Sequence, residues 1–500
     1  MKQVGHYIGG KPVAGSEKRN GPIFNPSTGQ QIATLDFADA QLADHAIGTA
    51  TAAQVSWGDA SQATRLGVMY KFRNLLIENS DRLARCIGLE NGKTIQDAHG
   101  ELARALEAVE FATNGPLVSK GEFSRNVGGG IDVYSMRVPL GVVACIAPFN
   151  FPVMVPLMMS AMAISVGNAV ILKPSEKVPS AALLLSDLWK EAGLPDGIWN
   201  VLNGDKEIVD VLLEHDGIAA VSFVGSTPVG EYVYHHGTAH NKRVASFTGG
   251  KNHMIVMPDA DLEAAAAGFV TAGYGSASQR CMALSLLVAV GDETADKLRE
   301  LLVPKINALR VGPYDDPSAD FGAVVSAQSK LSIVAAIAEG VKDGAEVLTD
   351  GRNVKIEGHQ DGYYLGPTLL DRVTPNMNVY KEEVFGPVRG IMRTSSLKTA
   401  IEITNKHQYG NGAVIYTRDG RTAQEFVARI DAGGIGVNVP VPVPVGYHNF
   451  GGFRRSRFGD AQLFGPDAAR FYTKLKTVSQ RWPEAQEAAA TASLAFPKNN

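Results

Sequence analysis

The chain contains the run Val142-Val143-Ala144-Cys145-Ile146-Ala147, a short apolar segment that predicts a buried β-strand. Similar apolar runs follow it, and segments with helical spacing of apolar residues separate them. Strands that alternate with helices indicate right-handed βαβ units and a parallel sheet. The strands predicted next are 169–172, 198–202 and 219–224, and the helices are 180–192, 205–214 and 227–236.

The sequence on either side of this region extends the α/β pattern. Residues 40–115 are mostly helical, and 252–445 repeats the alternation of strands and helices. Two alternating segments, 120–140 and 471–480, predict peripheral strands of the kind that pair across subunits. We therefore expect two Rossmann-type parallel-sheet domains plus a small β oligomerisation element. The expected division is 1–119 with 141–250, then 251–445, with oligomerisation strands in 120–140 and 460–482 and a flexible tail at 483–500.

The composition describes a globular protein without a dominant charge. Of 500 residues, 45% are hydrophobic, and 47 basic residues against 51 acidic ones give a net charge of −4. This balance excludes general disorder and argues against nucleic acid or an anionic membrane as partner. The three cysteines, Cys86, Cys145 and Cys281, are far apart, so they form neither a disulfide framework nor a zinc motif. A reducing compartment such as the cytoplasm is favoured, and no metal is expected.

Two segments without charged residues are each compatible with more than one structure or role. Phe151 to Leu172 is long enough to span a membrane, but Pro152, Pro156 and the Gly167-Asn168 pair interrupt it. We expect a buried helix that leads into a buried strand. The Val-Pro run at 439–445 predicts an extended loop, either the wall of a site or, less readily, a peptide-docking segment.

Cys281 is a candidate nucleophile because Arg280 precedes it directly. A neighbouring cation lowers the pKa of a thiol, and the thiolate is the reactive form. The alternative is a buried, inert cysteine, which is the expectation for Cys86 and Cys145.

Six motifs around Cys281 give this sequence a family resemblance. In their order and spacing they resemble the aldehyde dehydrogenase superfamily, over about residues 5 to 480. The closest likeness is to the CoA-acylating methylmalonate-semialdehyde dehydrogenases, through segments 250–260, 279–285, 436–440 and 471–478. The six motifs are Pro148-Phe149-Asn150-Phe151-Pro152, Lys173-Pro174-Ser175-Glu176, Phe223-Val224-Gly225-Ser226-Thr227-Pro228-Val229-Gly230, Phe247-Thr248-Gly249-Gly250-Lys251, Gln279-Arg280-Cys281 and Glu382-Glu383-Val384-Phe385-Gly386-Pro387-Val388.

The resemblance implies a covalent mechanism. Cys281 would attack an aldehyde, and the side-chain amide of Asn150 with the backbone N–H of Cys281 would hold the oxyanion. An alternative role for Asn150 is that of a helix N-cap beside Pro152.

The resemblance also implies NAD as cofactor. The first residues after two strands would bind it: Lys173 and Glu176 at the adenosine ribose, and Gly225, Ser226 and Gly230 at the pyrophosphate. A carboxylate at Glu176 favours NAD over NADP. Taken alone, Gly225-Ser226 could be any strand-to-helix turn, and Glu383 could belong to a solvated charge pair. The remaining implied cofactor contacts are Glu383 at the nicotinamide ribose, with Phe385 and Phe149 against the cofactor.

One position departs from the hydrolytic members of the superfamily. They carry a glutamate that activates water two residues before the Gly-Gly-Lys motif, where this chain has Phe247. Phenylalanine cannot act as a base, so the acyl group would pass to a thiol such as coenzyme A. The alternatives are a hydrolytic enzyme with another base and a catalytically silent family member.

A semialdehyde substrate with a carboxylate requires a cation, and a guanidinium fits best. The resemblance implies Arg104 and Arg280 in this role, and a surface pair with Glu101 or Glu107 is the alternative for Arg104. The segment 447–460 departs from the semialdehyde pattern, and the Arg cluster at 453–457 could hold CoA phosphates or form intersubunit pairs. The family further implies a homotetramer or homodimer.

Overall fold

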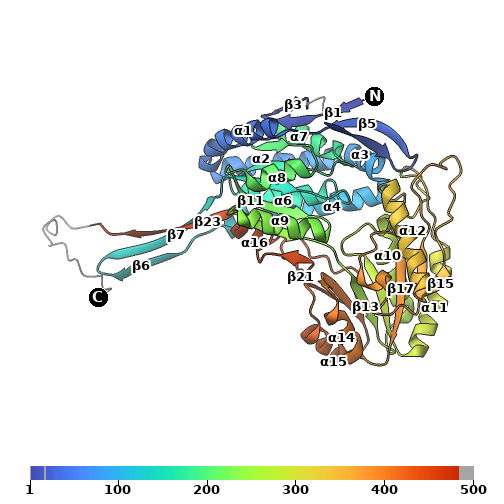
Figure 1. Cartoon of the computed structure of the whole chain (residues 1–500). Coiled ribbons are helices and arrows are strands. Elements are labelled where there is room, and N and C mark those ends of the chain that lie inside the picture. Colours follow the sequence, from blue (N-terminus) through green and yellow to red (C-terminus); the bar gives the residue numbers. More distant parts are fainter. Residues whose placement is uncertain (1, 16–18, 483–500) are drawn as a thin grey trace.

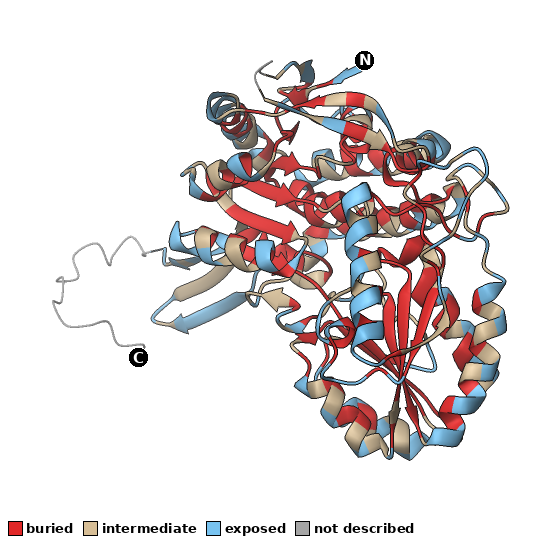
Figure 2. Ribbon diagram, turned by 45° about the vertical axis from the view of Figure 1, so that its right-hand side comes forward, coloured by how far each residue is buried: buried red, intermediate tan, exposed pale blue. Residues whose placement is uncertain are grey.

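The computed structural model describes residues 2–15 and 19–482, which form two large sheets and a projecting arm (Figure 1). A three-stranded sheet in the order β1-β5-β4 lies near the start of the chain. The strands of the two large sheets are mostly buried, as Figure 2 shows. The strands of the small sheet are β1 (Lys2–Val4), β4 (Asn20–Asn25) and β5 (Gln30–Asp36).

The first large sheet has eight strands in the order β22-β12-β11-β8-β9-β10-β2-β3. Its five central strands run parallel, which confirms the expected βαβ units, while the short strands at both edges are antiparallel. The central strands are β8 (Val142–Ile146), β9 (Ala169–Lys173), β10 (Trp199–Val201), β11 (Ile218–Val224) and β12 (Arg243–Phe247), and the edge strands are β2 (His6–Ile8), β3 (Lys11–Val13) and β22 (Arg457–Phe458).

Helices cover both faces of this sheet, because right-handed crossovers in opposite directions place them on opposite sides. α1, α8 and α9 contact one another in sequence, while α6 and α7 pack with α2, α3 and α4. The helices are α1 (Ala40–Asp59), α2 (Gln62–Glu78), α3 (Ser80–Asn91), α4 (Ile95–Ala112), α5 (Gly115–Val118), α6 (Met154–Ser165), α7 (Ser180–Glu191), α8 (Lys206–Glu214) and α9 (Thr227–Ala239).

The second large sheet has seven strands in the order β15-β16-β17-β14-β13-β19-β20, all parallel except the edge strand β15. Its strands are β13 (Asn252–Val256), β14 (Leu284–Val290), β15 (Glu346–Thr349), β16 (Thr368–Asp371), β17 (Val388–Thr394), β19 (Gly412–Tyr416) and β20 (Gly434–Val437). Its helices are α10 (Leu262–Tyr274), α11 (Asp292–Asn307), α12 (Ala327–Lys342), α13 (Asn378–Lys381), α14 (Leu397–Lys406) and α15 (Gly420–Arg429), with a short 3-10 turn η1 (Gly275–Ser278).

The arm is an antiparallel sheet in the order β23-β7-β6 that extends away from the two large sheets (Figure 1). Its strands are β6 (Phe123–Gly128), β7 (Ile131–Pro139) and β23 (Thr473–Gln480). The expectation of a strand throughout 460–482 is wrong for its first part, because α16 (Pro466–Phe471) is a helix that packs on the core of the first sheet. The expected tail at 483–500 lies outside the described residues.

The uncharged segment from Phe151 resolves as expected into a buried helix and a strand. α6 ends at Ser165, and β9 begins at Ala169 after the Gly167-Asn168 turn, in which Gly167 has a positive φ of 99°. Within the described part of the chain, no helix combines the length and apolar character needed to cross a membrane.

The two large sheets meet at opposite ends of their strands, the carboxyl ends in the first sheet and the amino ends in the second. The chain leaves the carboxyl end of β12 at Phe247 and enters the amino end of β13 at Asn252, four residues of loop later. A second connection between the two domains lies later in the chain. There, β21 (Phe453–Arg454) pairs with β18 (Tyr409–Gly410), and β22 pairs with β12. This places the carboxyl ends of the first sheet beside the amino ends of the second.

Candidate active site

A pocket of about 310 Å³ lies where the two sheets meet. Val224 and Phe247 from the carboxyl ends of β11 and β12 line it, and Cys281 and Asn411 from the amino ends of β14 and β19 line the other side. Val441 and Val443 of the Val-Pro run also contribute, which agrees with the expected wall of a site. The pocket therefore brings together segments that lie more than 150 residues apart in the chain.

The loop that carries Cys281 has a constrained backbone. Ser276, Ala277 and Ser278 all have positive φ, at 58°, 49° and 62°, a region that L-residues other than glycine seldom occupy. The carbonyl of Cys281 accepts hydrogen bonds from the side-chain amides of Asn252 and Asn411, both at 2.9 Å. These contacts fix the loop in the orientation that places Cys281 on the pocket wall.

Burial raises the pKa of the Cys281 thiol to about 11, and the negative charge of Glu383 adds to this rise. The backbone N–H groups of Cys281 and Met282 and then Arg280 lower it. Arg280 thus acts in the expected direction, but the expectation of a net lowered pKa is wrong for this structure, because the environment outweighs one cation.

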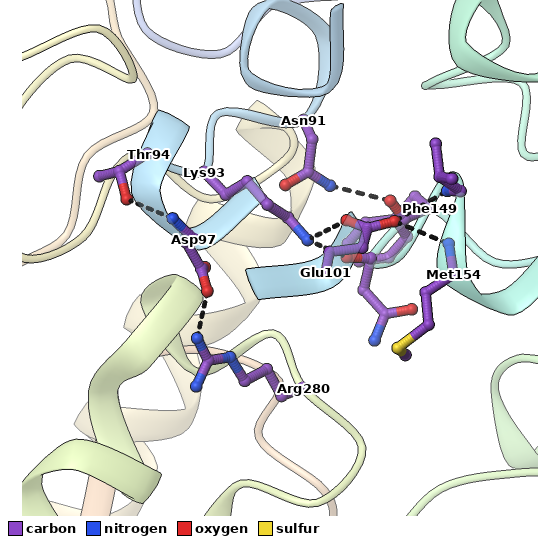
Figure 3. A network of polar contacts seen from close by, with 10 residues as sticks. Asn91, Lys93, Thr94, Asp97, Glu101, Phe149, Met154 and Arg280 are labelled. Carbon is purple, nitrogen blue, oxygen red and sulfur yellow. Dashed lines mark hydrogen bonds and ion pairs between the residues drawn. The ribbon is translucent and has the colours of Figure 1, made fainter. Parts of the chain in front are cut away.

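The segment that carries Asn150 is held by a buried ion pair, drawn in Figure 3. Lys93 Nζ donates to Glu101 Oε2 at 2.8 Å and to the carbonyl of Asn150 at 2.6 Å. Glu101 Oε1 accepts from the backbone N–H groups of Val153 and Met154, at 2.8 and 3.0 Å. The Glu101 carboxylate thereby caps the first turn of α6 from another helix.

This arrangement tests the helix N-cap role considered for Asn150. The N-cap of α6 is Val153, so the N-cap interpretation of Asn150 is wrong. The side chain of Asn150 is buried, and it forms no hydrogen bond within the described residues. Its neighbour Phe151 lines the pocket. A free amide next to the pocket remains compatible with the predicted oxyanion role.

One face of α4 carries three charged side chains, Asp97, Glu101 and Arg104, at the i, i+4, i+7 spacing of neighbouring helical turns. Arg104 lines the pocket and pairs with Glu107 at 2.8 Å, not with Glu101. Arg280 also lines the pocket, and its guanidinium pairs with Asp97. Although burial opposes it, the charges of Arg280 and Lys93 hold the pKa of Asp97 below its usual value. The structure therefore brings the two predicted arginines to one cavity.

Phe247, at the sequence position where a hydrolytic member is expected to carry its glutamate, lines the pocket. Its ring packs edge-on against Phe450 at 6.1 Å, and the guanidinium of Arg457 lies 5.5 Å from its centre. Among the described residues that line the pocket, the single carboxylate is Glu101, whose oxygens are occupied by Lys93 and by α6, and none is a histidine. The pocket wall thus offers no free general base for water.

The carboxyl ends of β8, β9 and β11 form the crevice expected for a dinucleotide, since the strand order reverses direction at β8. Lys173 ends β9, and its buried ammonium lies 3.6 Å from the half-exposed carboxylate of Glu176. Burial lowers the pKa of Lys173, and Glu176 opposes that change. A donor beside an acceptor fits the two hydroxyls of an adenosine ribose.

The predicted pyrophosphate residues lie at the start of α9. Ser226 is the N-cap but makes no capping hydrogen bond, so its side chain leaves the first N–H groups of the helix open to an anion. Gly230 has a packing role, because a methyl group there would lie 2.2 Å from Thr248 and 2.7 Å from Ser246. The absence of a side chain therefore lets α9 approach β12 closely.

Glu383 lies between the cofactor crevice and the pocket. It accepts a hydrogen bond from Gly250 N at 3.0 Å, and burial raises its pKa to about 7. Lys251 supports the same loop, because its ammonium donates to the carbonyls of Val379 and Glu382 at 2.7 and 2.8 Å. Phe385 contacts Phe149 edge-on at 5.9 Å. The structure thus brings Phe149 and Phe385 into contact and pairs Lys173 with Glu176, and the residue types present fit NAD.

The arginine cluster at 453–457 forms bonds within the chain. Arg454 pairs with Asp431, Arg455 pairs with Glu231 at 2.7 Å, and Arg457 donates to the carbonyl of Ala461 at 3.0 Å. Arg454 and Arg455 thereby tie this segment to the second and the first sheet domain, whereas the Arg457 bond is local, and all three bonds compete with the roles of CoA binding and intersubunit pairing considered from the sequence.

One set of described side chains has the spacing of metal ligands, Glu214, His236 and His240. These residues lie at the surface on α8, on α9 and just after α9, and none of them lines the Cys281 pocket.

The fold and this site define the class of protein. The sequence model of the aldehyde dehydrogenase family matches residues 13–478, and the chain belongs to that family. The resemblance inferred from the six motifs is thereby confirmed, as is the expected fold class.

Within the family, the chain is similar over nearly its whole length to several semialdehyde dehydrogenases. A malonate-semialdehyde dehydrogenase of Pseudomonas aeruginosa is 49% identical, and the match covers 99% of this chain and 100% of that protein. The human mitochondrial methylmalonate-semialdehyde/malonate-semialdehyde dehydrogenase [acylating] is 42% identical over 98% of this chain and 91% of its own length. A solved structure from Sinorhizobium meliloti 1021, complexed with NAD, has a TM-score of 0.96 and 48% identity, covering 97% of this chain and 99% of that one.

Sequence reasoning missed the residues that support the site. Asp97 and Lys93 had no assigned part, and Glu101 was considered only as a surface partner of Arg104. The periodic spacing of Asp97, Glu101 and Arg104 was the available signal, because such residues share one face of a helix. What that face contacts depends on the tertiary fold.

Proposed function

We propose that this protein oxidises methylmalonate or malonate semialdehyde with NAD and transfers the acyl group from Cys281 to coenzyme A. The observation that carries this proposal is a pocket with a cysteine and two arginines but no free base for water. A thiol acceptor needs no strong base, because its thiolate is present in useful amounts near neutral pH. The names of the Pseudomonas and human relatives agree with this substrate class.

Three groups of residues have separate roles in the proposed reaction. Arg104 and Arg280 bind the substrate carboxylate and direct the aldehyde carbon to Cys281, whose Sγ attacks it as the thiolate, after the thiol proton has passed to solvent. The amide of Asn150 and the backbone N–H of Cys281 stabilise the oxyanion. Lys173, Glu176, Ser226 and Glu383 hold the cofactor, which supplies a hydride acceptor when bound.

The proposed overall reaction yields NADH, CO2 and propionyl-CoA or acetyl-CoA, because a carboxylate β to the thioester carbonyl can leave as CO2. Phe247 and Phe450 keep this wall of the pocket apolar, which disfavours hydrolysis of the thioacyl enzyme.

We also propose that the chain works as a homo-oligomer, a dimer or tetramer, in the cytoplasm. Exposed apolar side chains on the arm, including Phe123 and Leu475, support an association role. The three free cysteines suit a reducing compartment.

NADH formation from each semialdehyde, with and without CoA, tests the activity on the wild type and on Cys281→Ala. We expect NADH that requires both CoA and Cys281, with the acyl-CoA as product. Sustained NADH formation without CoA, with the free acid as product, would instead favour the hydrolytic alternative.

A further inference from the structure

Asp97 has no part in the proposed reaction, yet it makes the one hydrogen bond that the Arg280 guanidinium forms within the described residues. The donor is Arg280 Nη2 and the acceptor is Asp97 Oδ1. The side chain of Asp97 is 15% exposed and that of Arg280 is 30% exposed, so the pair is largely shielded from water. Asp97 itself does not line the pocket, whereas Arg280 does.

Gly275 fixes the same guanidinium from a second direction. A methyl group at Gly275 would lie 2.6 Å from Nη1, 2.8 Å from Cζ and 2.9 Å from Nη2 of Arg280. The guanidinium therefore lies directly against the bare backbone of Gly275, where a larger residue would displace it. Two independent contacts, one polar and one steric, thus define the position of Arg280.

The contact with Asp97 leaves most of the guanidinium free. An arginine carries five N–H donors, and Asp97 accepts from one nitrogen. The remaining donors form no hydrogen bond within the described residues, so they are available to a carboxylate in the pocket. A side chain that is already fixed loses less conformational entropy when it binds a ligand.

We propose that Asp97 is a positioning residue that, together with Gly275, holds Arg280 on the pocket wall and so makes the enzyme select aldehydes that carry a carboxylate. The inference rests on the substrate class proposed above. It distinguishes the two arginines, because Arg104 pairs with Glu107 at a partly exposed position, where both side chains are about 40% accessible. A pair with this much access to water orients a side chain only weakly.

The test compares methylmalonate semialdehyde with propionaldehyde, in the presence of NAD and CoA, on the wild type and on Asp97→Ala. We expect kcat/KM for the carboxylated aldehyde to fall about tenfold, mainly through KM, while the value for propionaldehyde changes less than about twofold. Asp97→Asn keeps an oxygen acceptor at the same place and should restore most of the loss.

Gly275→Ala leaves Asp97 intact and should reproduce the selective loss by displacing the guanidinium. Glu293→Gln removes an exposed charge on α11 and serves as the control for charge change alone. Thermal unfolding of each variant shows whether it has folded.

Three results would overturn the inference. Equal losses for both aldehydes would give Asp97 a purely structural role, and unchanged kinetics in both Asp97→Ala and Gly275→Ala would remove its role altogether. A wild type that oxidises propionaldehyde but not the carboxylated aldehyde would overturn the proposed substrate as well. That third failure is visible in the wild-type measurements, before any variant is compared.

Discussion

At the scale of single residues, the surroundings of Cys281 shift the pKa of its thiol in opposite directions. Burial and Glu383 raise its pKa to about 11, and Arg280 lowers it by less. Near neutral pH the thiolate fraction is then roughly 100-fold smaller than for a thiol with a pKa of 9.0. In the ligand-free enzyme, Cys281 is therefore almost entirely in the unreactive thiol form.

This predicts the pH dependence of alkylation of Cys281 in the ligand-free enzyme. Because the thiolate is the reactive form, the rate should keep rising as pH increases toward about 11, instead of levelling near 9. Glu383→Gln removes a negative charge and should raise the rate at neutral pH, whereas Arg280→Ala should lower it. Iodoacetamide labelling followed by mass spectrometry measures these rates.

Cys281→Ser supplies the background from the other two cysteines, and burial raises the pKa of Cys86 and of Cys145 to about 12. A rate that levels off below pH 9, or a Glu383→Gln variant that reacts more slowly than the wild type, would contradict the electrostatic account.

At the scale of elements, α4 organises the site from one face. Asp97 holds Arg280, Glu101 caps α6, and Arg104 enters the pocket. The cap matters because the residues just before α6 include Asn150, whose carbonyl Lys93 also holds. A charge pair buried between α4 and α6 therefore sets the backbone of the predicted oxyanion site.

Glu101→Ala should destabilise the protein by about 3–5 kcal/mol, because Lys93 is left buried without its partner and two N–H groups lose their acceptor. Activity should fall at least about tenfold in the protein that stays folded, because the Asn150 segment loses its support. The shift of the urea unfolding midpoint and kcat measure the two effects.

Glu110→Ala is the matched control on the same helix, since Glu110 pairs with Arg73 at a partly exposed position. It should cost less than about 1 kcal/mol. Combining Lys93→Met with Glu101→Gln should recover part of the lost stability, because no charge stays buried. Equal losses of stability in Glu101→Ala and Glu110→Ala would show that the buried pair stabilises the protein no more than the more accessible pair does.

At the scale of the whole molecule, the arm extends beyond the body that contains both large sheets (Figure 1). β7 pairs with β23 along the full length of β23, so segments more than 330 residues apart form one sheet. Phe123 and Leu475 on this sheet are 64% and 56% exposed. A projecting sheet with uncovered apolar side chains fits an interface between copies of the chain.

Phe123→Ser combined with Leu475→Ser should shift the protein to a smaller species, because the apolar contact is lost while both large sheets keep their cores. Light scattering coupled to size-exclusion chromatography measures the mass. Leu331→Ser on α12, at a residue that is also 64% exposed, is the control and should change nothing. A monomeric wild type would refute the proposed association.

Most strands and helices, the family and a candidate nucleophile could be predicted from the sequence of this protein alone. Apolar runs such as Val142–Ile146 fold as strands because their side chains must be buried, and the six motifs identified the family and the candidate nucleophile. The departure at Phe247 was also visible, since the loss of a base depends on residue type alone.

Which side chains act on one another could not be predicted in this way, because it depends on the packing of distant segments. The raised pKa of Cys281 comes from burial and from Glu383, more than 100 residues further along the chain. The roles of Asp97, Lys93 and Glu101 likewise depend on how α4 packs against α6 and the Cys281 loop. Local sequence sets backbone propensity and hydrophobic pattern, whereas burial and charge proximity arise from contacts between distant segments.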